Sequence, residues 1–250
     1  MASTIVSSDA PLSAGPHSAD EVRQMFTAIV PRYDLLNHLL SFGLDRLWRR
    51  QLVGQVTQAD GHGQPSVALD LGCGTGDMVV ALARRLGLSS RVLGLDVCRP
   101  MIDHARVKCA DLATVSLAVA DATSLPAADE SCDVATMAFA LRNIVDREAA
   151  LREMVRVVRP GGRIAILEFC RPRGRLWPAI FGFYFRRILP IVGRVVSGHP
   201  SAYRYLERSV GVFDDPEHLA ARLTALGARV VMQRRLVGGV TAMTVATKVS

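Results

Sequence analysis

The feature that most constrains this chain is the stretch VALDLGCGTGDMVVALARR, residues 67–85. An apolar run typical of a buried strand leads into three glycines within five positions, Gly72, Gly74 and Gly76, and a segment with helical spacing follows. Glycine adopts positive φ without strain and lets another group approach closer than a Cβ would allow. We therefore expect a strand, a tight loop that makes room for a small molecule, and a helix.

The alternation of strands and helices continues through the middle of the chain. Apolar runs predict strands over 66–71, 91–96, 116–121, 132–139 and 162–169. Helical spacing of apolar residues predicts helices over 77–86, 100–112 and 147–158. Strands that are apolar throughout are typical of a parallel sheet covered by helices on both faces. The sequence thus predicts an α/β protein with a doubly wound, mostly parallel sheet.

The N-terminal part of the chain departs from this pattern. Residues 1–19 are mostly Ser, Ala, Pro and Gly, which predicts a disordered tail before a single domain at 20–250. The helical spacing that follows is broken at Pro31 and Gly43, so we expect two or three short helices, with residues 20–55 as a lid. Tyr33, Asp34, Asn37 and Trp48 are candidates to close over a ligand, although Trp48 is better explained by packing.

The C-terminal part predicts an addition to the sheet. After an insertion at 171–210, a helix is expected to start near Pro216 and to end at Leu226. Two strands joined at Gly238 and Gly239 follow, and they read as an antiparallel hairpin that completes a sheet of seven strands.

The spacing of the cysteines and the length of the apolar segments limit the classes of protein to which the chain is expected to belong. The five cysteines form no CxxC pair, which argues against a disulfide framework and against a zinc site or other metal centre. The first residues lack the basic and apolar segments of a signal peptide, and no stretch of about 18 uncharged apolar residues occurs. We expect a cytoplasmic protein.

The ligand of the glycine loop is narrowed by its charged neighbours. A dinucleotide fingerprint needs a third glycine where Asp77 stands, and a carboxylate there would repel a pyrophosphate. Asp70 can instead attract an ammonium group, and Asp96, at a strand end, can bind both hydroxyls of a ribose. Asp121 can accept a hydrogen bond from an adenine amino group, with the small Ala122 beside it. The alternative is that these acids only cap helices and that the loop is a tight turn.

This order, D-x-G-x-G-x-G, then Asp, then Asp-Ala at successive strand ends, resembles the class I S-adenosylmethionine-dependent methyltransferases. Three further segments closely resemble the quinone-biosynthesis C-methyltransferases: VPRYDLLNHLLSFGLDRLWRR (30–50), ALRNIVDREAALREMVRVVRPGGRIAILEFCRP (140–172) and AYRYLERSVGVF (202–213). The resemblance implies a Rossmann-like fold with S-adenosylmethionine as cofactor. It implies cofactor contacts from Thr75, Asp96, Asp121 and Ala122. The family also has a serine contact, and this chain departs from it with Ala138 and Ala140.

The same resemblance implies C-methylation of demethylmenaquinol to menaquinol, with 2-methoxy-6-polyprenyl-1,4-benzoquinol of ubiquinone biosynthesis as the alternative substrate. Attack by a ring carbon needs the phenolic oxygen deprotonated or nearly so, and it needs no metal. Arg142 and Asn143 are the catalytic candidates, with Arg142 either contacting substrate or forming a structural ion pair. Asp146 is favoured as a helix cap over a proton acceptor. Glu168 either lines the substrate side or is solvated.

The net charge of +7 is concentrated in one segment, and this distribution indicates which kinds of partner the protein binds. Residues 169–206 hold seven arginines and no Asp or Glu. Residues 171–196 combine this charge with apolar side chains, so they either meet an anionic membrane and a polyprenyl tail or pack as a buried helix pair. The residues concerned are Phe181, Phe183, Tyr184, Phe185, Arg186 and Arg187. An RNA-binding protein on the same fold has only the basic charge in its favour, so we expect no nucleic-acid partner. A homo-oligomer is compatible with the sequence.

Overall fold

The computed structural model describes residues 18–57, 64–174, 176–184, 187, 209–210, 213 and 215–249. Residues 1–17 of the predicted tail lie outside the described residues. Most of the predicted insertion beyond Tyr184 does so too, including Phe185 and Arg186.

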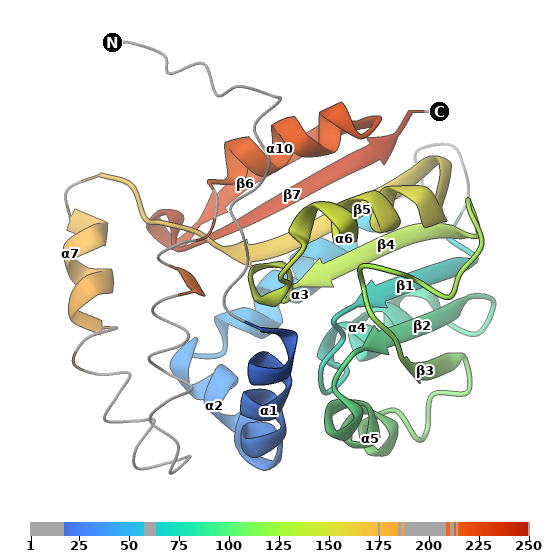
Figure 1. Ribbon diagram of the computed structural model, residues 1–250, viewed down its shortest axis with the longest axis horizontal. Helices are drawn as coiled ribbons and strands as arrows, with labels where there is room; N and C mark the ends of the chain where they lie inside the picture. The colour runs from blue at the N-terminus through green and yellow to red at the C-terminus, as the bar shows by residue number, and fades with distance from the viewer. Residues whose placement is uncertain are drawn as a thin grey trace.

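Seven strands form one sheet in the order β3-β2-β1-β4-β5-β7-β6 (Figure 1). The strands are β1 Val67–Leu71, β2 Arg91–Asp96, β3 Val115–Val119, β4 Cys132–Ala138, β5 Val158–Phe169, β6 Ala228–Leu236 and β7 Thr241–Lys248. All pairings from β3 across to β5 are parallel, and the chain order reverses beside β1, which lies between β2 and β4. The predicted doubly wound, mostly parallel sheet is confirmed.

The C-terminal hairpin joins the sheet through its second strand. β7 pairs antiparallel with both β5 and β6, which leaves β6 at the edge. The connection is a single turn at Val237–Gly239, where Gly238 and Gly239 have φ of 62° and 88°. Strands joined by so short a turn must pair antiparallel, which is the predicted hairpin. Because β7 is inserted, β6 runs in the same direction as β1 to β5.

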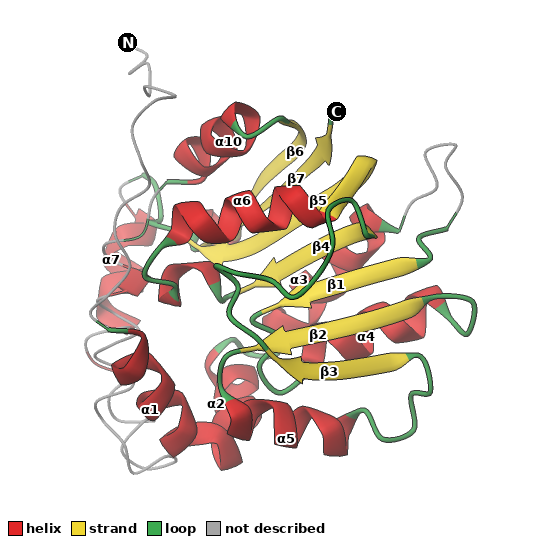
Figure 2. Ribbon diagram, turned by 45° about the vertical axis from the view of Figure 1, so that its right-hand side comes forward, coloured by secondary structure: helices red, strands yellow, loops and turns green. Residues whose placement is uncertain are grey.

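Helices cover both faces of the sheet (Figure 2). One face carries α6 (Arg147–Val157) and α10 (Pro216–Ala225), and the other carries α3 (Leu44–Val56), α4 (Asp77–Leu86) and α5 (Arg99–Lys108). In β1, Leu69 and Leu71 pack toward the first layer and Ala68 toward the second, as side chains alternate along a strand. Both faces are therefore buried, which explains the continuous apolar runs in the sequence.

Three helices precede the sheet, α1 (Ala19–Ile29), α2 (Tyr33–Leu40) and α3. The breaks fall where predicted, because Pro31 lies in a short 3-10 turn and Gly43 has φ of 74°. Helix α3 packs on the sheet and buries Trp48, so the packing interpretation of that side chain is confirmed. Helix α1 lies beyond the carboxyl ends of the strands (Figure 2).

Two predicted strand boundaries differ from the structure by more than one residue. β3 ends at Val119, and Asp121 lies in the following turn, where its carboxylate accepts hydrogen bonds from Thr123. β5 starts at Val158 and continues through Pro160, although the Pro-Gly-Gly sequence there is typical of a turn. Pairing with β4 resumes after an irregularity in register, so tertiary pairing overrides the local preference.

The five cysteines are all buried and unpaired, as expected from their spacing. Within the described part of the chain, no helix combines the length and the apolar character that a membrane span requires.

Candidate functional site

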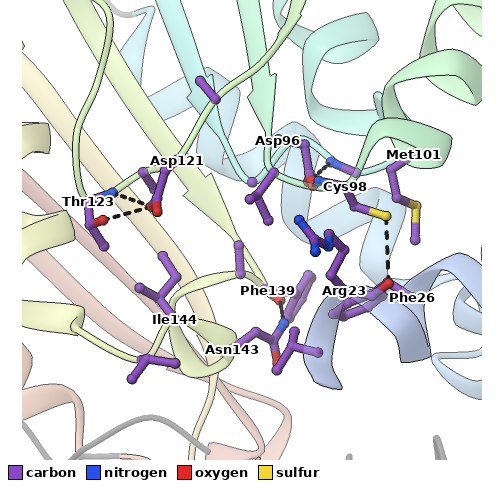
Figure 3. A pocket seen from close by; sticks show the side chains of 18 of the residues that line it. Arg23, Phe26, Asp96, Cys98, Met101, Asp121, Thr123, Phe139, Asn143 and Ile144 are labelled. Carbon is purple, nitrogen blue, oxygen red and sulfur yellow. Dashed lines mark hydrogen bonds between the residues drawn. The ribbon is translucent and has the colours of Figure 1, made fainter. Parts of the chain in front are cut away.

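A cavity of about 260 Å³ opens where the strand order reverses, at the carboxyl ends of the strands (Figure 3). The glycine loop, the segments after β2, β3 and β4, and helix α1 line it. It brings together these predicted residues: Gly72, Gly74, Asp96, Asp121, Ala122, Ala138, Ala140 and Asn143. Val22, Arg23 and Phe26 of α1 line its side.

Asp96 ties the glycine loop to the second strand. Its Oδ2 accepts a hydrogen bond of 2.8 Å from the Gly74 backbone N–H, and its Oδ1 accepts one of 2.8 Å from the Cys98 N–H. Burial raises the pKa of Asp96, although these two hydrogen bonds oppose the increase. Each carboxylate oxygen has further acceptor capacity, so Asp96 can bind a ligand's hydroxyls while it holds the loop.

The glycines of the loop are needed for the packing of the chain as well as for the approach of a ligand. Gly72 has φ of 63°, and a Cβ there would lie 2.4 Å from the Cβ of Ala140. Gly76 has φ of 91°, is the N-cap of α4, and would bring a Cβ to 3.2 Å from that of Ala105. The glycines thus allow other parts of the chain to pack closely against the loop, in addition to the close approach predicted for a ligand.

Asp70 and Thr75 line a smaller pocket of about 20 Å³ that shares Gly72, Gly74 and Ala138 with the large cavity. Asp70 is 1% exposed, accepts a hydrogen bond of 2.6 Å from Thr136 Oγ1, and has its pKa raised to about 7 by burial. The hydroxyl of Thr75 donates to Asp34 of α2. Helix α2 and the glycine loop are therefore joined directly.

A second cavity, of about 240 Å³, lies on the other side of Tyr33 and Phe139 and is lined mainly by aromatic and aliphatic side chains. Phe139 has φ of 60° at the end of β4 and packs its ring 4.8 Å from that of Phe169. Such strain in a non-glycine residue is typical of functional sites. Neither Phe139 nor Phe169 was predicted as a site residue from the sequence, although both stand at strand ends, as the predicted acids do.

Arg142 lies at the wall of the second cavity and is 5% exposed. Its Nη1 donates to Glu168 Oε1 at 2.8 Å and to the Phe139 carbonyl at 2.5 Å, and its guanidinium lies 5.2 Å from the centre of the Phe169 ring. The ion pair considered for Arg142 is present, and the same side chain faces the cavity. Glu168 is 3% exposed, so the solvated alternative for it was wrong.

Asn143 and Asp146 occupy the turn after β4, beside the first cavity. Asn143 donates to the Phe139 carbonyl at 3.3 Å (Figure 3). Asp146 is the N-cap of α6 and accepts a hydrogen bond of 2.8 Å from the Ala149 N–H, so the cap interpretation is confirmed.

A network of charges behind the glycine loop was not expected from the sequence. Lys108 Nζ lies 2.5 Å from Asp34 Oδ2 and 2.8 Å from Asp77 Oδ1, and thus joins α5 to α2 and to α4. Burial lowers the pKa of Lys108, but the hydrogen bonds that it donates to both carboxylates outweigh this effect and raise the pKa overall. Nearby, His38 Nδ1 lies 2.8 Å from Asp45 Oδ2. No sequence motif signals these pairs, because they depend on how the helices pack.

Comparison with known proteins gives a family-level match. The profile of the ubiE/COQ5 methyltransferase family matches residues 16–248. The chain is 39% identical to the "Ubiquinone/menaquinone biosynthesis C-methyltransferase UbiE" of Geotalea uraniireducens, over 92% of this chain and 97% of that protein. It is 42% identical to the "Demethylmenaquinone methyltransferase" of Deinococcus radiodurans, over 91% and 92%.

Solved structures share the fold at low sequence identity. The [4+2]-cyclase SpnF superimposes with a TM-score of 0.68 at 18% identity, covering 96% of this chain and 99% of that one. A SAM-dependent methyltransferase from Thermotoga maritima superimposes with a TM-score of 0.62 at 18% identity, covering 91% and 99%. These likenesses concern the fold alone.

Proposed function

This chain belongs to the ubiE/COQ5 methyltransferase family, and we propose that it transfers a methyl group from S-adenosylmethionine to a ring carbon of demethylmenaquinol. The observation that supports this best is the pair of cavities that meet at Tyr33 and Phe139, one lined by acids at strand ends and one by aromatic side chains. The alternative substrate is 2-methoxy-6-polyprenyl-1,4-benzoquinol, since the names of some relatives include both ubiquinone and menaquinone biosynthesis.

The residues present fit S-adenosylmethionine. Asp96 would bind the ribose hydroxyls and Asp121, beside Ala122, the adenine, since all three line the first cavity. Asp70 would bind the ammonium group. Burial raises the pKa of this carboxyl to about 7, so a cationic ligand beside it would stabilise the charged carboxylate. When bound, S-adenosylmethionine supplies an electrophilic methyl group on its sulfonium.

The pKa of Asp70 makes cofactor affinity depend on pH. We expect the affinity for the demethylated product, S-adenosylhomocysteine, to rise about tenfold from about pH 6 to about pH 8. Asp70 is mostly protonated below its pKa of about 7, and only the carboxylate attracts an ammonium group. Calorimetric titration measures the affinity, with Asp70→Asn as the control that should lose this dependence. The same pH dependence in Asp70→Asn would refute the assignment.

The second cavity suits a quinol ring, and its wall supplies the charge that the reaction needs. Phe139 and Phe169 line it with packed aromatic rings and exclude water. Arg142 stays protonated, so it stabilises a phenolate oxygen electrostatically and cannot itself accept the proton. Glu168 holds the guanidinium of Arg142 in place through the buried ion pair. Electron density from the phenolate then activates the adjacent ring carbon.

The test of the proposed function is incubation of the protein with a labelled methyl donor and each reduced quinone precursor in detergent. We expect demethylmenaquinol to gain one methyl group on carbon, as mass spectrometry of the product shows. Equal turnover of the benzoquinol would assign both pathways to this chain. Turnover of the benzoquinol alone, or of neither quinol, would overturn the proposal.

We further propose that the surface formed by α2 and α7 (Leu176–Phe183) meets an anionic membrane and admits the polyprenyl tail. Leu35, Leu39 and Phe42 are 60%, 50% and 80% exposed, and Ile180 and Phe183 are 47% and 60% exposed. The helices are held together because Tyr184 Oη donates to the Leu40 carbonyl at 2.7 Å. This apolar surface borders the second cavity, and the adjoining segment is rich in arginine.

The double substitution Phe42→Ser/Phe183→Ser is expected to weaken binding to anionic phospholipid vesicles at least about tenfold, because it removes two side chains that would enter the bilayer. Cosedimentation measures the binding. Leu88→Ser is the matched control, since Leu88 is 88% exposed in the loop after α4. Unchanged cosedimentation of the double variant would contradict a membrane role for this surface.

A further inference from the structure

Arg49 of α3 lines both the small pocket that holds Asp70 and the aromatic second cavity. Its side chain is 11% exposed. One guanidinium nitrogen, Nη1, donates to Asp45 Oδ2 at 2.7 Å, and the group lies 5.2 Å from the centre of the Phe139 ring. Among the described residues, the other N–H groups of this guanidinium have no hydrogen-bond acceptor. The buried guanidinium of Arg49 thus lines the small pocket with N–H groups that remain available to a ligand.

The other charges around this pocket are already engaged. Asp77 is paired with Lys108 at 2.8 Å, and Lys108 also binds Asp34. Asp45 accepts from His38 and Ser41 as well as from Arg49. His38, Asp45 and Asp77 together have ligand atoms within 4.8 Å of one another, but Arg49 and Lys108 already compensate their charge. Arg49 keeps N–H donors beyond its bond to Asp45, and Asp70 keeps acceptor capacity beyond its bond from Thr136, so these two groups on the pocket wall are able to bind a ligand.

We propose that Arg49 binds the α-carboxylate of S-adenosylmethionine, opposite Asp70, which binds the ammonium group. This inference rests on the cofactor assigned in the proposed function. A guanidinium recognises a carboxylate through charge-assisted hydrogen bonds, and an acid and a base on one small pocket match the zwitterionic end of an amino acid. The positive charge of Arg49 also lowers the pKa of Asp70 against the effect of burial, in keeping with their facing one pocket.

The position of the pocket supports this orientation of the cofactor. It shares Gly72, Gly74 and Tyr33 with the large cavity, where Asp96 would hold the ribose. It shares Tyr33 and Arg49 with the second cavity. The residues of the small pocket and of the large cavity would thus hold the two ends of one cofactor, and Tyr33 lines the cavity for the quinol as well.

Calorimetric titrations with three ligands separate the contributions of Arg49 and Asp70 to binding affinity. S-adenosylhomocysteine carries both charges, its decarboxylated form keeps only the ammonium group, and 5′-methylthioadenosine has neither. Arg49→Met is expected to weaken S-adenosylhomocysteine by about tenfold to a hundredfold and to leave the other two unchanged. Asp70→Asn should instead weaken both amine-bearing ligands and spare 5′-methylthioadenosine. Arg50→Met is the matched control, because Arg50 is the exposed neighbour on the same helix.

Arg49→Met leaves Asp45 without its arginine partner, and this is expected to lower the stability of the variant. Arg49→Lys and the double variant Asp45→Asn/Arg49→Met are therefore titrated with the same three ligands. The lysine variant should lose part of the affinity for S-adenosylhomocysteine alone, since the charge remains without the planar fork. The double variant should show the full loss for that ligand alone. Equal weakening of all three ligands, or no weakening, would overturn the proposal. So would slower quinol turnover with intact binding of S-adenosylhomocysteine, which would assign Arg49 to the second cavity. If the unaltered protein bound none of the ligands, the proposed function itself would fail.

Discussion

Asp96→Asn is expected to weaken binding of S-adenosylhomocysteine by at least about a hundredfold, or about 3 kcal/mol. The carboxylate has two oxygens, and each already accepts one backbone N–H, from Gly74 and Cys98. An asparagine offers only one oxygen, so its amide group would face a backbone donor. The ribose would lose a charge-assisted bidentate partner, and the glycine loop would lose the bond that sets its position.

The same substitution should lower the free energy of unfolding by about 1–3 kcal/mol, because one buried N–H is left without an acceptor. Thermal unfolding without ligand measures this effect separately from binding. Asp121→Asn is the matched control, since Asp121 is an exposed acid whose carboxylate accepts two hydrogen bonds from Thr123 within its own turn. We expect its effect on affinity to be no more than about tenfold. Wild-type affinity in Asp96→Asn would remove the basis of the cofactor assignment.

Arg142→Met is expected to lower kcat for quinol methylation by about a hundredfold to a thousandfold, while the affinity for S-adenosylhomocysteine stays unchanged. Arg142 faces the second cavity rather than the first, and it supplies the positive charge next to the developing phenolate. Without that charge, deprotonation of the quinol becomes harder. The pH profile of kcat should therefore shift to higher pH, which a purely structural role would not produce.

This substitution also leaves Glu168 buried without its partner, so a loss of stability of about 3–5 kcal/mol is expected. The double variant Arg142→Met/Glu168→Gln removes both charges and should regain much of that stability. If its kcat remains low, the loss of activity reflects chemistry at the cavity. Recovery of kcat together with stability would contradict the electrostatic role, because it would assign Arg142 to folding alone.

The elements of the fold follow from local patterns in the sequence. The two-residue period of strands and the 3.6-residue period of helices are local, so the runs at 67–71 and 77–86 indicate β1 and α4 without knowledge of the rest. The predicted limits were wrong at the start of β5, where pairing with β4 overrode the local preference, and at the end of β3, where Asp121 lies in a turn and accepts hydrogen bonds from Thr123. Strand ends were also sufficient to bring Asp96 and Asp121 into one cavity, because parallel strands end at the same edge.

The sequence by itself determined the parallel sheet, the loop at its reversal point and the acids around it, because each depends on patterns local to a few residues. Only the tertiary structure decided which acids are already paired, that Arg142 binds Glu168, that Lys108 joins α2 to α4, and that Arg49 and Asp70 line one pocket. These contacts join residues up to 74 positions apart. Their distances depend on how whole helices pack, and no local period encodes that packing.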